Sequence, residues 1–149
     1  MATVASVTDL TQWVADRLEE NTWSIGFSVH RYYLPYIALE SITGPMVSVF
    51  IPSLTSEPTP RTKTTEDVGV AIRVYARMTP TGLAAQDKYA KLLEEIRDYF
   101  RHQNTTQPSG CEYYRASQIN LIDPDDLIER NLYAGQVILD YKCRRDTGA

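Results

Sequence analysis

The sequence has few of the residues on which catalytic and metal centres are usually built. It contains two cysteines and two histidines in 149 residues, without a Cys-x-x-Cys pair, a His-Glu-x-x-His helix or a calcium-loop spacing. Its seven glycines form neither of the common phosphate-binding loops. We therefore predict a protein that is not an enzyme and that has no cofactor and no metal ligand.

Long apolar runs and an excess of basic charge are missing as well. No apolar run approaches the roughly 20 residues of a membrane helix, and residues 1–6 lack the basic start and apolar region of a secretion signal. The net charge of −4 argues against a protein that binds nucleic acid through many phosphate contacts. These observations predict synthesis in a cytoplasm and no membrane partner.

The few reactive side chains each have a structural explanation. Cys111 and Cys143 are able to meet across neighbouring strands, but the lack of a secretory context favours reduced thiols that pack as small residues. His30 falls in a strand-like stretch, and His102 falls near a helix end, where histidine interacts favourably with the terminal carbonyls. The acids around Pro124 suggest the start of a short helix more than a cation site.

Composition and length favour one globular domain spanning residues 1–149. Hydrophobic residues make up 43% of the chain and charged residues 23%, which is enough apolar material to build a core. Helical spacing predicts helices at about residues 7–20 and 83–101, with one short helical turn after Asp123. Alternating apolar residues predict strands near residues 25–32, 46–51, 68–77, 112–122 and 137–144, whereas residues 36–42 are ambiguous.

Residues 52–66 interrupt this pattern. The segment contains three prolines and many serine and threonine residues, and it shows no apolar periodicity. We interpret it as a long loop or extended arm that begins where Pro52 stops the preceding strand. The predicted fold is therefore α+β. It has an antiparallel or mixed sheet of four to five strands, two main helices on one face and a long extended arm between strands.

The apolar phases of these elements predict the core. Its members are Trp13, Leu18, Val49, Val70, Ile72, Val74, Leu92, Leu93, Ile96, Phe100, Leu139 and Tyr141. Tyrosine is the one compositional excess, with ten residues, and the adjacent Tyr32 and Tyr33 suit either a sheet rim or a protein interface.

The order of these features over residues 7–145 resembles the tail terminator, or tail-completion, proteins of long-tailed bacteriophages. After the first helix come Arg31-Tyr32-Tyr33-Leu34-Pro35 and a strand that ends Val49-Phe50-Ile51-Pro52. A polar arm with Arg61 follows, and then the strand that begins Asp67-Val68-Gly69-Val70, the helix with Leu92-Leu93-Glu94-Glu95-Ile96 and the closing strand from Gly135 to Tyr141. Arg61 follows Pro60, where a small hydroxyl residue is expected in related sequences.

The resemblance implies a structural virion protein of the tail's neck region, made in the host bacterial cytoplasm. Such proteins form a ring, commonly a hexamer, on the head-proximal end of the tail tube, where they stop polymerisation and present a surface to the head connector. The implied partners are further copies of the chain, the tail tube protein and a head–tail connector or head-closure protein, and DNA passes through the ring without specific binding. Candidate subunit or tube contacts are Tyr32, Tyr33, Pro58, Pro60, Arg61 and Lys63.

Two other interpretations remain open from the sequence. Another neck, head-closure or tail-tube component shares small α+β or β-rich domains with extended arms. A small ligand-binding domain or enzyme is a more distant alternative, because a fold does not determine a function.

Overall fold

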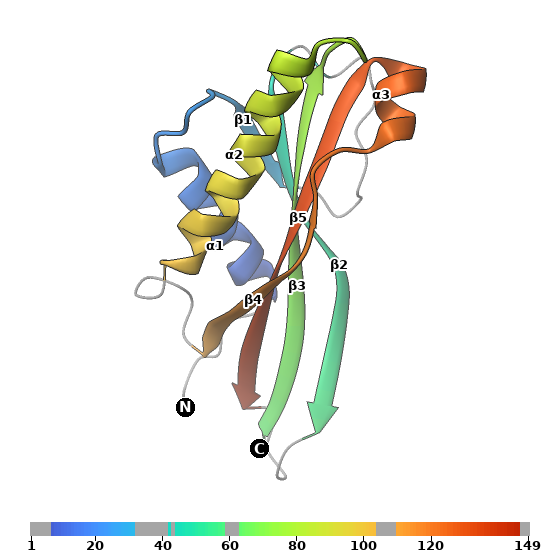
Figure 1. Ribbon diagram of the computed structural model, residues 1–149. Helices are drawn as coiled ribbons and strands as arrows, with labels where there is room; N and C mark the ends of the chain where they lie inside the picture. The colour runs from blue at the N-terminus through green and yellow to red at the C-terminus, as the bar shows by residue number, and fades with distance from the viewer. Residues whose placement is uncertain (1–6, 32–41, 43, 59–62, 104–109, 147–149) are drawn as a thin grey trace.

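A single mixed sheet carries the fold (Figure 1). The computed structural model describes residues 7–31, 42, 44–58, 63–103 and 110–146. In this part of the chain, five strands lie in the order β1-β2-β3-β5-β4, and three helices accompany them. The strands are β1 (Ser28–Arg31), β2 (Met46–Pro58), β3 (Lys63–Arg77), β4 (Cys111–Asn120) and β5 (Leu132–Asp146). The predicted α+β class with a mixed sheet is confirmed.

The central pairings are antiparallel, and only β1 runs parallel to its neighbour β2. β3 is the middle strand, as its strict alternation predicts, and it pairs with β5 at every position from Lys63 to Arg77. The predicted strand beginning near Ile25 is shorter in the structure, where β1 starts at Ser28. Residues 21–27 instead form an irregular segment with bends at Asn21, Ser24 and Ile25, and Trp23, Ile25 and Phe27 pack against the core.

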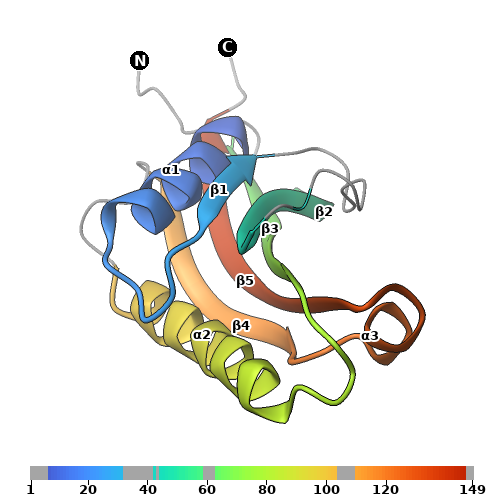
Figure 2. The same cartoon turned by 90° about the horizontal axis from the view of Figure 1, so that it is seen from above.

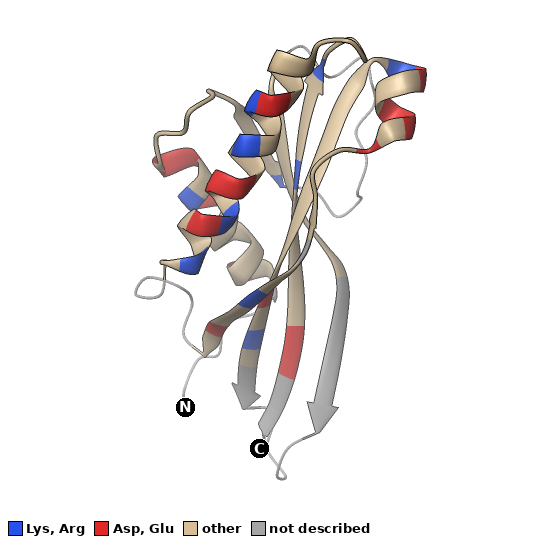
Figure 3. Cartoon of the chain, in the orientation of Figure 1, with Lys and Arg blue, Asp and Glu red and all other residues tan. Residues whose placement is uncertain are grey.

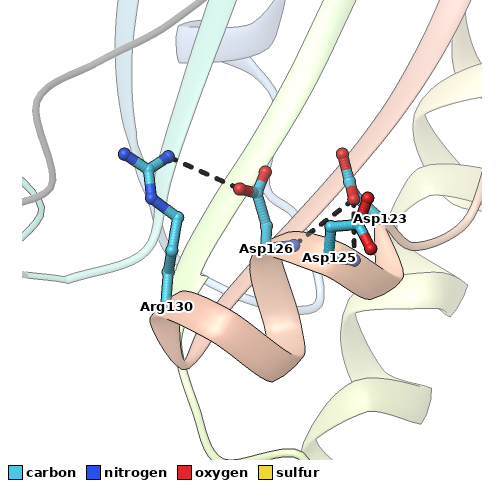
Figure 4. A network of polar contacts seen from close by, with 4 residues as sticks. All are labelled: Asp123, Asp125, Asp126 and Arg130. Carbon is cyan, nitrogen blue, oxygen red and sulfur yellow. Dashed lines mark hydrogen bonds and ion pairs between the residues drawn. The ribbon is translucent and has the colours of Figure 1, made fainter.

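Two long helices cover one face of the sheet (Figure 2). They are α1 (Val7–Glu20) and α2 (Leu83–Arg101), and both lie within a residue or two of their predicted bounds. The short α3 (Pro124–Arg130) connects β4 to β5 on the opposite side of the molecule from α1 and α2 (Figure 2). Asp123 caps α3 by accepting hydrogen bonds from the Asp125 and Asp126 amides, which confirms the capping interpretation of this acidic turn (Figure 4).

The core lies between the helices and the sheet. All twelve predicted core residues are buried, and most of them have no exposed surface. Trp13 of α1 packs edge to face against Phe100 of α2 and Tyr141 of β5, with ring centroids 5.9 Å and 6.3 Å apart. One indole thus joins both helices to the sheet. Burial raises the pKa values of Tyr133 and Tyr141 well above the ordinary value for tyrosine.

Close packing of α2 on β5 explains why residue 135 is a glycine. A Cβ atom at Gly135 would collide with the Leu93 side chain and would lie 2.8 Å from the Leu121 carbonyl oxygen. The Tyr133 hydroxyl donates a hydrogen bond to that same carbonyl. Gly135 therefore permits the close approach of α2 and of the chain after β4 to the start of β5.

We predict that Leu93→Ala lowers the free energy of unfolding by about 2–5 kcal/mol, because it opens a cavity where α2 packs on the sheet. Leu83→Ala is the matched control, since Leu83 lies on the same helix with 68% of its surface exposed. Urea unfolding followed by circular dichroism measures both. Equal effects of the two substitutions would contradict the helix packing described above.

Candidate functional site

Three strands extend beyond the part of the sheet that the two long helices cover (Figure 1). They are the end of β2, the beginning of β3 and the end of β5, which pair side by side. Pro58 lies opposite Thr64 in the hairpin formed by β2 and β3, and Lys63 lies opposite Asp146 of β5. We call these residues, 53–58, 63–66 and 143–146, the sheet extension.

The sheet extension corrects one sequence prediction. Pro52 does not end the strand, because β2 continues through it to Pro58. The register shifts between Phe50 and Ser53, so Ile51 and Pro52 stand outside the ladder, and the missing N–H of proline breaks no pairing there. Most of the expected loop is therefore a paired β-hairpin, although it is extended as predicted.

One long edge of the sheet extension lacks a described neighbour. β1 pairs with β2 only from Met46 to Val49. Beyond that point, among the described residues, β2 has β3 on one side and no strand on the other. Backbone groups along such an edge are available to pair with another chain, which makes the sheet extension a candidate contact surface.

The structure places two of the six predicted contact residues. Pro58 is the last residue of β2 and Lys63 is the first of β3, so both lie at the far end of the sheet extension. Tyr32, Tyr33, Pro60 and Arg61 lie outside the described residues. Pro58 is paired with Thr64, the neighbour of Lys63 in β3, so these two candidate contact residues lie close together.

A disulfide lies where β4 meets the sheet extension. Cys111 begins β4 and is directly paired with Cys143 of β5, at a Cα–Cα distance of 4.1 Å, and the structure joins the two residues by a disulfide. The expectation of two separate reduced thiols is therefore wrong. Antiparallel register brings opposed side chains close together, and that register is not evident from two cysteines 32 residues apart.

A groove of about 370 Å³ lies on the sheet face opposite the helices, next to the sheet extension. Its lining includes Gly69 and Ile138 as well as several charged residues. Arg115 lies 3.4 Å from Asp140, and the Arg115 and Lys142 cations lie 5.1 Å and 4.7 Å from the ring of Tyr114. Sequence reasoning missed this cluster, because two irregularities in β4 change which of its residues share a face.

The groove suits contact with a polypeptide. Its charges of both signs are partly paired with one another, and Tyr114 is 55% exposed. Charged residues of both signs also lie along α1 and α2 (Figure 3). Within the described ranges, no three His, Cys, Asp or Glu residues are grouped in a way that would hold a metal ion.

The two histidines lie on different elements. His30 is in β1, and His102 follows α2, where its amide donates to the Tyr99 carbonyl at 3.1 Å. His102 therefore lies at the helix end, as its place in the sequence predicts.

The comparisons with known proteins give no family. The sequence matches no protein-family model, and a search of curated proteins returns no match. In the part of the chain that the structure describes, no helix has the length and apolar character needed to cross a bilayer.

We predict that the disulfide stabilises the folded chain by about 2–4 kcal/mol, because it closes a loop that contains β4 and α3. Dithiothreitol should lower the melting temperature of the wild-type protein and should leave that of a C111S/C143S variant unchanged. Mass spectrometry without reductant checks that the bond is present. A wild-type melting temperature that does not respond to complete reduction would contradict the stabilising role.

Proposed function

We propose that this chain is a structural virion protein of a long-tailed bacteriophage. It forms a ring at the head-proximal end of the tail tube, ends tail polymerisation and provides the surface that joins the head connector. The proposal combines the order of sequence features with one structural observation, which is the sheet extension projecting beyond the helix-covered core (Figure 1).

The sheet extension supports this role through its shape. A ring of identical copies needs two different complementary surfaces on each copy, because each contact is head-to-tail. An extended hairpin that leaves the body of one subunit is able to reach a neighbour, and its open β2 edge offers main-chain hydrogen bonds. Hence the same hairpin suits contact with a neighbouring copy or with the tube end.

Charge is compatible with a ring around DNA. The chain carries a net charge of −4, and a lumen lined by such copies would not hold a phosphate backbone tightly. Local charge still permits specific protein contacts, since Lys63 is the first residue of β3 and Arg61 precedes it by two positions in the sequence.

A shortened hairpin tests the function. Residues 56–66 are replaced by Asn-Gly, which joins Thr55 to its partner Asp67 with a two-residue turn that matches the register. The variant should fold, because the helix-covered core keeps its strands. It should fail to complete tails in cells infected by the phage that lacks its own copy of the gene, and free heads and unjoined tails should accumulate.

A second variant separates the effect of the hairpin's length from the effect of its positive charges. R61E/K63E keeps the full hairpin and reverses two cations, so it should fold equally well and should weaken tail completion less than the shortened chain does. Circular dichroism and thermal melting check the fold of both variants. Normal yields of infectious particles from the shortened chain would refute the role of the hairpin in tail completion.

A further inference from the structure

A groove of about 620 Å³ lies between α2 and the segment that follows α1, at Ser24 and Ile25. Ile25, Ala85 and Tyr89 supply its apolar lining, and Lys88 and Lys91 stand exposed beside them on α2. The groove thus has an apolar floor. Its rim carries two ammonium groups, those of Lys88 and Lys91, and one carboxylate, that of Glu95, so its net charge is positive.

Hydrogen bonds fix the walls of this groove. The Ser24 hydroxyl donates to Glu95 Oε2 at 2.7 Å, and the Ser24 amide donates to Glu95 Oε1 at 3.3 Å. Trp23 donates from Nε1 to the Leu18 carbonyl at 2.7 Å and packs against Tyr99. These bonds hold the Glu95 carboxylate against Ser24 without removing its charge. Lys88 and Lys91 still leave the rim with a net positive charge, which favours an acidic partner.

α3 carries the complementary features. Ile128 is 68% exposed, although it follows the buried anchor Leu127. Asp125 is exposed, and Ile128 and Glu129 follow it by three and four residues, so all three are exposed on the same side of the helix. Asp126 pairs with Arg130 at 3.4 Å and lies apart from this group (Figure 4). An exposed isoleucine beside two carboxylates matches an apolar groove beside two ammonium groups.

The two surfaces lie on opposite sides of the molecule. α2 and the segment after α1, which together line the groove, lie on one side in Figure 2, and α3 lies on the other. α3 therefore does not reach the groove of its own chain, whereas α3 of a second copy is able to dock there. Repetition of such a head-to-tail contact generates a ring when the rotation closes.

We propose that α3 of one copy docks into the α2 groove of the next copy, with Ile128 in the apolar floor and Asp125 and Glu129 against Lys88 and Lys91. This contact deepens the proposed function and rests on it for the expectation that copies of the chain meet. It supplies a second subunit contact, separate from the sheet extension.

A charge exchange between two variants tests the contact. One variant carries K88E/K91E in the groove, and the other carries D125K/E129K on α3. Each alone places like charges across the contact, so the dissociation constant for self-association should rise by about tenfold or more. An equimolar mixture restores opposite charges at both kinds of junction, and its association should return towards the wild-type level.

Sedimentation velocity over a concentration series at low salt measures this association, with circular dichroism as the check on folding. R97E/R101E is the matched control, because it makes the same charge change on the same helix, towards the other end of α2 and outside the lining of the groove, and should leave association unchanged. Ile128→Ser should weaken association without altering its dependence on salt, since it removes only the apolar part of the contact.

Three outcomes would overturn the inference. They are a wild-type protein that stays monomeric throughout the series, a mixture that fails to recover association, and a control that weakens association as strongly as the groove variant. Tail completion distinguishes this failure from failure of the proposed function. A failed exchange with normal tail completion refutes only the docking contact, whereas a restored exchange in a protein that never completes tails refutes the phage role.

Discussion

The continuous pairing of β3 with β5 is the constraint on which the rest of the structure depends. The two strands pair from Lys63 opposite Asp146 to Arg77 opposite Leu132, without a register shift. Inside the core, this ladder presents Val70, Ile72 and Leu139 to the helices. Beyond the core, the same ladder continues as the sheet extension. Stability and the candidate contact surface therefore rest on one uninterrupted set of backbone hydrogen bonds.

Elements with strong local patterns were predictable from the sequence. α2 has an apolar stripe through Leu92, Leu93 and Ile96 and was expected at its observed bounds. β3 alternates strictly and was expected to end near Arg77, but it begins at Lys63, earlier than its alternation near Val68 indicated. The Asp123 cap was also evident, because aspartate before proline is a local signal of a helix start. Each of these features depends on residues close together in the sequence.

Features that depend on strand register were not predictable. Pro52 looks like a strand end, yet a local shift in pairing lets β2 continue past it. Cys111 and Cys143 meet only because β4 and β5 adopt one particular alignment, and Tyr114 joins Arg115 and Lys142 for the same reason. The α2 groove likewise needs the segment around Ser24 to pack against Glu95, a contact across 71 positions. A single sequence contains no direct record of such alignments.

We propose two contact surfaces on one helix-covered core. The sheet extension projects from one end of the sheet, and α3 and the α2 groove lie on opposite sides of the body (Figures 1 and 2). We propose that copies of this chain cap a tail tube. Electron microscopy of the purified protein mixed with tail tubes tests it most directly. If copies of the chain cap the tube, ring-shaped density is expected at one end of each tube. Bare tube ends, or density spread along the tube walls, would contradict the proposal.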